Sequence, residues 1–198
     1  PPSALARWNA DGTLDLWLPN QQPEAVQGVA AGVAGLEPGQ VNIHSPMLGG
    51  FFGRHFLYGA GTVFPQAIML SKAVGAPVKV IWSREEEFLR DALRPLGVAR
   101  FKAGLDADGM PVAMQAQAVG EGPFGRWIYK PADGPDSSAV EGIAHKPYAI
   151  PNRHVTHVHI PVTAQIGFWR SVGHSMNDFF YETFFDEMAD AGGKDPYE

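Results

Sequence analysis

Two segments around a short turn constrain the fold of this chain more than any other feature. Residues 98–105 and 110–119 flank Asp106-Ala107-Asp108-Gly109. Asp-Gly between two such segments is a strong signal for the turn of a hairpin. The sequence therefore predicts an antiparallel hairpin in the middle of the chain.

Further strands and helices alternate on both sides of this hairpin. The predicted strands are residues 4–8 and 14–18 around an Asp-Gly turn, 40–44, 77–82 and 153–160. The predicted helices are 23–35, 63–74, a short helix capped by Ser83, and 175–191. Interspersed elements with an antiparallel pair indicate the α+β class, with mixed sheets and helices packed on one face.

The last helix carries the clearest helical pattern. Ser175 and Asp178 fit a capping box, and an apolar stripe recurs at helical spacing. The stripe consists of Met176, Phe180, Phe184 and Met188. By contrast, residues 120–152 form a long irregular loop, and loops of that length are uncommon unless they are functional or mobile.

Composition excludes several classes of protein. The net charge of -6 argues against a nucleic-acid partner, because phosphate binding needs a basic face. The absence of cysteine excludes disulfides and thiolate metal sites in this chain, and no stretch approaches the ~18 apolar residues of a membrane span. Charged residues are only 18%, so we expect a partner or another domain to cover part of the surface. The chain starts at Pro1 without a methionine, so we expect it to be processed or part of something longer.

A glycine-rich segment is the first candidate site. Gly49-Gly50-Phe51-Phe52-Gly53-Arg54 combines consecutive glycines with an arginine. Glycine lets backbone N–H groups approach a ligand and form an anion-binding concavity. The alternative is a tight turn after a strand, and the pattern alone does not decide between the two.

The second candidate leads into the last helix. Gly167-Phe168-Trp169-Arg170-Ser171-Val172-Gly173-His174 places an arginine and a histidine beside a helix N-terminus, where unpaired N–H groups favour negative charge. Arg170 and His174 are therefore candidates to hold an anionic cofactor or to polarise a carbonyl oxygen. The alternative is surface residues near a helix cap.

Two weaker candidates remain. His157 and His159 lie on one face of a predicted strand and could bind a metal, although no third ligand is indicated. In Asn20-Gln21-Gln22, a side-chain amide could donate to an oxo or carbonyl group, or the segment is an ordinary polar turn.

Taken together, these segments resemble the molybdenum-binding subunit of the xanthine dehydrogenase/aldehyde oxidase family, in particular its isoquinoline 1-oxidoreductase beta-subunit branch. The matching motifs follow the family's order along nearly the whole chain. They are residues 18–21, 47–54, 83–87 and 167–174, the last running into the helix that continues to Pro196. The resemblance implies that residues 1–198 are part of the molybdopterin-binding region of a larger subunit, with the α+β fold of that region.

The family hydroxylates an N-heterocycle or an aldehyde with oxygen from water. The resemblance implies a molybdenum–molybdopterin cofactor, which we expect in its cytosine dinucleotide form, a small [2Fe-2S] subunit that takes the electrons, and a small-molecule substrate. Gln21 is similar to the glutamine beside the metal or pterin. Gly49, Gly50, Phe51, Phe52, Gly53 and Arg54 resemble the cofactor loop. Phe52, Trp169 and Arg170 resemble the substrate pocket, and Arg170 is the implied catalytic residue.

Three departures from the family pattern qualify this reading. Phe51 stands where the family loop has a third glycine, and His55 replaces a more usual arginine or lysine. The family's glutamate base lies outside this chain, so we expect the chain to be inactive alone. A rival hypothesis is a non-catalytic interaction module that has lost the cofactor. The resemblance leans toward periplasmic export by a twin-arginine signal, and the sequence leaves a cytoplasmic location open.

Overall fold

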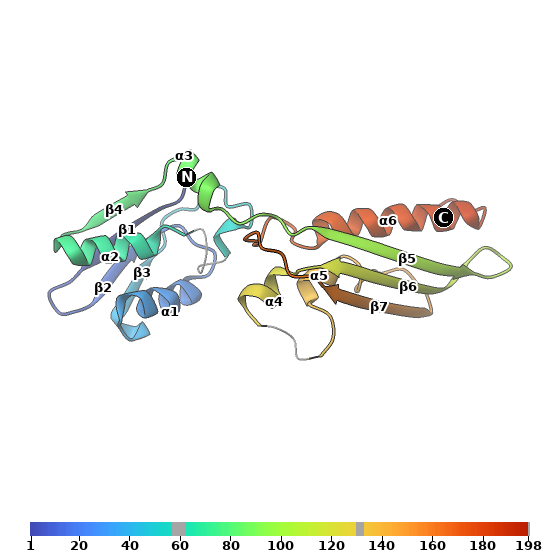
Figure 1. Ribbon diagram of the computed structural model, residues 1–198, viewed down its shortest axis with the longest axis horizontal. Helices are drawn as coiled ribbons and strands as arrows, with labels where there is room; N and C mark the ends of the chain where they lie inside the picture. The colour runs from blue at the N-terminus through green and yellow to red at the C-terminus, as the bar shows by residue number, and fades with distance from the viewer. Residues whose placement is uncertain (57–61, 130–132, 198) are drawn as a thin grey trace. The chain divides into compact units, whose positions relative to one another are not determined.

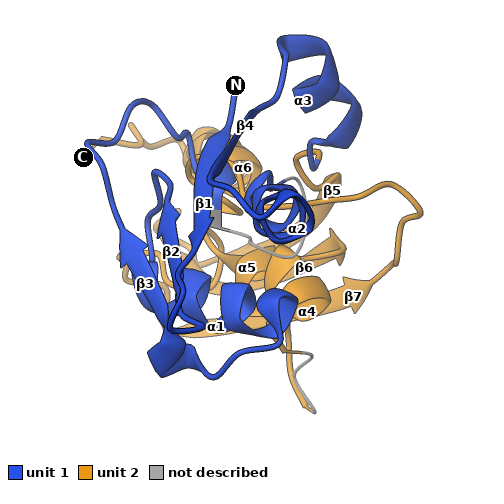
Figure 2. Ribbon diagram, turned by 90° about the vertical axis from the view of Figure 1, so that its left-hand side faces the viewer, with its two compact units in different colours: residues 1–92 blue, residues 93–198 orange. Residues whose placement is uncertain are grey.

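The chain folds into two compact units, residues 1–92 and 93–198, which are coloured separately in Figure 2. The computed structural model describes residues 1–56, 62–129 and 133–197. The two units have their own sheets and their own cores, and each is described by itself.

A mixed four-stranded sheet forms the centre of the first unit (Figure 1), with strand order β3-β2-β1-β4. Its strands are β1 (Ser3–Trp8), β2 (Leu14–Trp17), β3 (Val41–His44) and β4 (Val78–Ile81). β1 pairs with β2 and β4 in antiparallel fashion, as the Asp-Gly turn predicts, whereas β2 and β3 are parallel. β2 and β3 therefore end at the same edge of the sheet.

Two helices cover one face of this sheet. They are α1 (Pro23–Ala34) and α2 (Phe64–Val74), and both end at a glycine in the left-handed conformation, as predicted. Their apolar faces pack on Ala4, Ala6, Leu14 and Leu16 of the central strands, all of which are buried. The shorter helices of this unit are η1 (Pro38–Gln40), η2 (Arg54–Phe56) and α3 (Arg84–Arg90). Ser83 caps α3, because its hydroxyl accepts a hydrogen bond of 3.2 Å from the Glu86 N–H.

The other face of the sheet carries a polar network around Asp15. Its carboxylate accepts hydrogen bonds from Arg7 and from the amides of Asn9 and Asn42, at 3.1 and 3.0 Å for the two amides. The Arg7 guanidinium outweighs the cost of burial and holds the pKa of Asp15 far below its usual range. The hydrogen bonds of this buried carboxylate are therefore satisfied by side chains of the same unit.

The second unit contains a three-stranded sheet of order β5-β6-β7 and the long helix α6 (Figure 1). The strands are β5 (Gly97–Leu105), β6 (Pro111–Gly120) and β7 (Asn152–His159), and the helix is α6 (His174–Ala191). β5 and β6 form the predicted hairpin, and β7 adds to β6 in parallel. Met114, Ala116 and Ala118 of β6 face Tyr181 and Met188 of α6 in one core, so helices cover one face here as well. The α+β prediction is confirmed.

The connection between β6 and β7 is less irregular than its sequence suggests. Residues 120–152 include the short helices α4 (Pro123–Trp127) and α5 (Ser137–Val140). Pro123 occupies the first turn of α4, and the Asp136 carboxylate caps α5 by accepting from the Ser138 N–H at 2.9 Å. Helices of four or five residues are too short to show a helical period, so the sequence pattern missed them.

The start and the buried face of α6 also differ from the prediction. The helix begins at His174, and Ser175 does not cap it, since its hydroxyl donates to the Arg170 carbonyl at 3.1 Å. The buried residues of α6 are Asn177, Tyr181 and Met188, so two of them lie one position after the predicted Met176 and Phe180, whereas Met188 is buried as predicted. Tyr181 fits this apolar face because its ring packs edge-on against Phe101 and parallel to Tyr148. None of the described helices is both long and apolar enough to span a bilayer.

Contact between two glycines fixes the far end of the second unit. A Cβ added at Gly192, after α6, would lie 2.4 Å from the Gly109 carbonyl oxygen in the hairpin turn. We therefore expect Gly192→Ala to lower the free energy of unfolding by about 1–3 kcal/mol, because the backbones must move apart. Urea titration measures this difference. Gly104→Ala in β5 is the matched control, since a Cβ there meets nothing within 4 Å, and equal stability of the two variants would contradict the prediction.

Candidate functional site

The glycine loop, residues 47–54, follows β3 in the first unit and exposes its glycine backbone. Gly49 and Gly50 are exposed, and a Cβ at Gly49 would meet nothing within 4 Å. Phe52 has a left-handed φ of 54° and its side chain is 64% exposed. Its ring lies 2.8 Å from where a Gly50 Cβ would be, so the ring packs over the bare backbone of Gly50. The loop therefore offers open backbone and one exposed aromatic ring.

Phe51, the departure from the family motif, is engaged within the same loop. Its ring stacks on His55 with 4.2 Å between ring centroids. Burial, together with the nearby Arg54 charge, lowers the pKa of His55 and favours the neutral imidazole in this stack. Arg54 forms an ion pair with Asp91, and both side chains are mostly buried. The Arg54–Asp91 ion pair thus connects the glycine loop to the last residues of the first unit.

Asn20 and Gln21 lie beside the glycine loop because of the sheet topology. β2 and β3 are parallel, so the segments that follow them, residues 18–22 and 45–54, leave the same edge. Buried Asn20 joins the two segments: its Nδ2 donates to the Leu18 carbonyl at 3.2 Å and to Ser45 Oγ at 2.8 Å. Gln21 is exposed just before α1. The structure therefore joins the segments that carry Gln21 and the glycine loop at Asn20 and Ser45, at the carboxyl ends of parallel strands where ligands of α/β sheets commonly bind.

The arginine loop, residues 167–173, leads into α6 in the second unit and has a strained backbone. Ser171 and Val172 have φ values of 66° and 43°, which side chains with a Cβ rarely adopt, β-branched valine least of all. Arg170 is exposed, and its guanidinium makes no hydrogen bond or ion pair within the described part of the chain. Its charge is therefore available to a ligand.

Arg94 holds the arginine loop, and sequence reasoning missed it. Its guanidinium donates to the Arg170 carbonyl at 3.2 Å, to the Val172 carbonyl at 3.4 Å and to Ser175 Oγ at 2.8 Å. It also lies over the Trp169 ring, 5.8 Å from the ring centroid. An arginine 76 residues before the loop carries no local signal of this role, so only the tertiary structure shows it.

Helix α4 supports the segment that precedes the arginine loop. Arg126 donates to the carbonyls of Val162 and Ala164, both at 2.6 Å, and Trp127 Nε1 donates to the Ile166 carbonyl at 2.7 Å. The buried ring of Phe168 packs edge-on against Phe124 at 5.1 Å. The long 120–152 connection therefore serves as a support for the candidate site.

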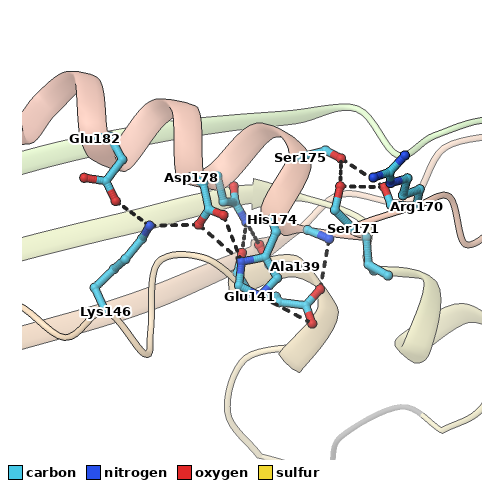
Figure 3. Close-up of polar contacts among 12 residues, drawn as sticks. Ala139, Glu141, Lys146, Arg170, Ser171, His174, Ser175, Asp178 and Glu182 are labelled. Carbon is cyan, nitrogen blue, oxygen red and sulfur yellow. Dashed lines mark hydrogen bonds and ion pairs between the residues drawn. The ribbon is translucent and has the colours of Figure 1, made fainter.

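The N-terminus of α6 already has an anion supplied by the chain itself. Glu141 Oε2 accepts a hydrogen bond of 3.0 Å from the Gly173 N–H (Figure 3). His174 Nδ1 contacts Asp178 Oδ2 at 3.0 Å, and its ring also lies near Glu141. Internal carboxylates therefore contact both His174 and this helix end, and the expectation that they hold an anionic cofactor stays a prediction. Of Arg170 and His174, only His174 has a carboxylate partner among the described residues.

A charged network continues along α6 from His174, as Figure 3 shows. Lys146 Nζ bridges Asp178 Oδ1 at 2.9 Å and Glu182 Oε1 at 2.6 Å. Tyr148 donates its hydroxyl to Glu182 Oε2 at 2.6 Å. Burial opposes ionisation of Glu182, but the hydrogen bonds from Lys146 and Tyr148 prevail and hold the pKa of Glu182 below its ordinary value. This network ties the 141–148 segment to the helix.

The histidines of β7 are not arranged as a metal site. His157 Nε2 lies 3.0 Å from the Gly120 carbonyl oxygen, and its Nδ1 accepts from the Asp136 N–H at 3.3 Å. Neither these histidines nor any other described His, Cys, Asp or Glu residues form a group of three that could hold a metal ion. His157 therefore has a structural role between β6, β7 and α5.

The donor set fits an anionic, pterin-type cofactor. The glycine backbone, the Gln21 amide and the Arg170 guanidinium are exposed groups that can donate hydrogen bonds. The buried Asn20 Oδ1 has no hydrogen-bond partner among the described residues, which is rare for a buried polar atom and typical of functional regions. The glycine loop and the arginine loop belong to different units, so the expectation that they line one pocket stays a prediction, as do the individual residue roles.

The charged network predicts acid-sensitive stability of the second unit. The pKa of Glu182 is lowered by folding, so its contribution is complete above its ordinary pKa of 4.5 and is lost as the pH falls through the folded value. We expect Glu182→Gln to reduce the free energy of unfolding at pH 7 by less than about 1 kcal/mol, since the side chain is partly exposed. The difference from wild type shrinks toward pH 3.

Urea titrations at pH 7 and pH 3 measure this difference. Glu187→Gln is the control, because Glu187 is exposed on the same helix and has no ion pair with a described residue. A deficit of Glu182→Gln that is equal at both pH values would contradict a role for the ionised carboxylate.

Comparison with known proteins places this geometry in a family. Residues 1–198 match the molybdopterin cofactor-binding domain family. The chain is 28% identical over 205 residues to the isoquinoline 1-oxidoreductase subunit beta of Brevundimonas diminuta, covering 100% of this chain and 25% of that protein. It is 30% identical to the membrane-bound aldehyde dehydrogenase (pyrroloquinoline-quinone) of Gluconacetobacter polyoxogenes, covering 99% of this chain and 26% of that protein.

The fold agrees with this relationship. The aldehyde oxidoreductase from Desulfovibrio gigas superposes with a TM-score of 0.81 at 23% identity, over 99% of this chain and 21% of that structure. The chain spans about a quarter of the length of the two curated relatives. The resemblance inferred from the ordered motifs is confirmed, and the chain belongs to the molybdopterin cofactor-binding domain family.

Proposed function

We propose that this chain supplies part of the molybdopterin and substrate site of a molybdenum hydroxylase, an oxidoreductase that hydroxylates an N-heterocycle or an aldehyde with oxygen from water. The family match over residues 1–198 supports binding of molybdopterin. The relative from Brevundimonas diminuta is named an oxidoreductase subunit, which supports a redox activity carried out by more than one polypeptide.

One structural observation carries the assignment of the site. Within the described residues, the only non-glycine residues with positive φ are Phe52, Ser171 and Val172. All three lie in the glycine loop or the arginine loop, the two segments that carry the family motifs. Strained backbone of this kind costs free energy and concentrates at active and ligand-binding sites. Strain confined to these two loops supports a shared functional role.

The chain's own residues act by binding and orienting. The exposed backbone of Gly49 and Gly50 and the amide of Gln21 donate hydrogen bonds to the cofactor, and the exposed ring of Phe52 packs against the ligand. The Arg170 guanidinium stabilises negative charge that develops on the substrate, beside Trp169. When bound, molybdopterin carries the molybdenum that accepts the two electrons of the oxidation.

Finer features of the whole protein are part of the same proposal. We propose the cytosine dinucleotide form of the cofactor, a small [2Fe-2S] subunit as electron acceptor, and the rest of the subunit as the cover for the surface of these two units. The resemblance to the isoquinoline 1-oxidoreductase branch supports these choices and a periplasmic location. The general base is supplied from outside this chain, so the 198-residue chain alone is inactive.

Molybdenum content and turnover test the proposal. We expect the purified 198-residue chain not to hydroxylate isoquinoline or aldehydes, and the full subunit with its iron–sulfur partner to contain molybdenum and turn over. In that complex, Arg170→Gln lowers kcat by about 10²–10³-fold with unchanged molybdenum content, because a charge that stabilises the transition state is lost. Arg100→Gln is the control, since Arg100 is also exposed and has no hydrogen bond to a described residue.

Two outcomes would contradict the proposal. Turnover with stoichiometric molybdenum in the isolated chain would show that no outside base is needed. Pyrroloquinoline quinone in place of molybdenum in the full complex, the cofactor named for the second relative, would overturn the cofactor assignment.

The rival function, an interaction module without cofactor, depends on Phe51. Because the Phe51 ring already stacks on His55, its side chain has a place inside the loop. We expect Phe51→Gly in the full subunit to leave molybdenum content within about twofold of wild type, whereas a module that lost the cofactor through Phe51 would gain molybdenum. Elemental analysis of both proteins distinguishes the two, with His55→Ala as a control for loss of the ring stack alone.

A further inference from the structure

The last residues of the first unit hold the glycine loop. Arg54 Nε donates to Asp91 Oδ2 at 2.9 Å, and a second guanidinium nitrogen pairs with Asp91 Oδ1. The two side chains are only 13% and 18% exposed, so the pair is well shielded from water. Such a two-point Arg–carboxylate contact fixes orientation as well as distance. Asp91 is thus the anchor of the glycine loop, one residue before the first unit ends at Ala92.

The first residues of the second unit hold the arginine loop in the same way. Leu93 N donates to the Gln165 carbonyl at 2.7 Å, and its own carbonyl accepts from the Gly167 N–H at 3.0 Å. Arg94 then reaches the carbonyls of Arg170 and Val172. These contacts hold a loop that includes the strained Ser171 and Val172, a conformation that persists only when surrounding groups over-determine it.

We propose that the four residues Asp91-Ala92-Leu93-Arg94 are a positioning junction that anchors both candidate loops to the connection between the two units. The effect of this junction on the cofactor site rests on the proposed function. The anchoring of each loop rests on contacts within one unit. Asp91 and Arg94 are separated by three peptide units of roughly 3.8 Å, so their Cα atoms are at most about 11 Å apart whatever the arrangement of the units. The covalent junction therefore limits how far the two anchors can separate.

The two anchors lie on one short stretch of chain. Each anchor binds its loop through charge-assisted hydrogen bonds from an arginine. Ala92 between them is buried, with 2% of its surface exposed. Binding and catalytic groups must be held to a fraction of an ångström by supporting contacts, and each anchor supplies such contacts to its own loop.

Amide hydrogen exchange of the 198-residue chain tests the anchors without any cofactor. The Arg54 amide donates to the Phe51 carbonyl, and the Val172 amide donates to the Trp169 carbonyl, so each loop has its own protected amide. We expect Asp91→Asn to speed exchange at Arg54 by roughly tenfold or more and to leave Val172 unchanged, since the anchor loses its charge. We expect Arg94→Gln to speed exchange at Val172 and to leave exchange at Arg54 unchanged.

Arg84→Gln is the matched control, because Arg84 pairs with Glu87 inside α3 and has no hydrogen bond or ion pair with either loop among the described residues. Unchanged exchange at both amides in Asp91→Asn and Arg94→Gln would overturn the proposal. This readout does not depend on molybdenum, so it fails or succeeds separately from the proposed function.

Insertion of two glycines between Ala92 and Leu93 tests the junction in the full complex. Both anchors keep their loops, so we expect exchange at Arg54 and Val172 to match wild type. The constraint on their separation is lost, so we expect cofactor retention during dialysis, measured as molybdenum and pterin content, to fall at least fivefold. Wild-type retention with intact anchors would overturn the role of the junction, whereas absence of molybdenum from wild type would contradict the proposed function instead.

Discussion

The candidate site depends on backbone that would not keep its conformation unaided. Val172 at a φ of 43° and Ser171 at 66° lie in a region that costs roughly 1–3 kcal/mol for each residue, so other contacts must offset that cost. The Arg94 guanidinium supplies them by donating to the carbonyls of Arg170 and Val172 and to Ser175 Oγ. The arginine loop therefore keeps its shape through a side chain from a distant part of the sequence.

The first unit reaches a similar result by topology. The β2-α1-β3 connection puts β3 beside β2 in parallel, so the segments after both strands leave the same sheet edge. The Asn20 amide then joins the two segments through Ser45. The exposed glycine backbone and exposed Gln21 therefore lie on segments that leave the same edge, whereas α1 and α2 pack on one face of the sheet in an apolar core.

Local patterns were sufficient to predict most of the fold. The hairpin of β5 and β6 and the glycine-terminated helices α1 and α2 follow from turn chemistry, caps and periodicity, which neighbouring residues encode. The same patterns failed where tertiary contacts prevail. Ser175 has the sequence of a cap but bonds to Arg170 and Arg94 instead, and the buried face of α6 is set by the rings of Phe101 and Tyr148 around Tyr181.

The site could be predicted only in part, for the same reason. Motif order identified both loops, but nothing near Arg94 or Asp91 in the sequence indicates that they hold those loops. Their partners lie 76 and 37 residues away, and long-range hydrogen bonds leave no local periodicity. The α4 residues Arg126 and Trp127 support the segment before the arginine loop from within a stretch whose composition indicated only an irregular connection.

Electrostatics narrows what the arginine loop can contribute. The α6 N-terminus would attract an anion, but Glu141 already accepts the Gly173 N–H, and Asp178 already engages His174. Lys146 in turn neutralises Asp178 and Glu182, so the charges along the helix are balanced internally. Arg170 makes no hydrogen bond or ion pair with a described residue through its guanidinium, on a chain with a net charge of -6. In the proposed function this guanidinium stabilises the negative charge that develops on the substrate, so the backbone that Arg94 holds has the role of placing Arg170.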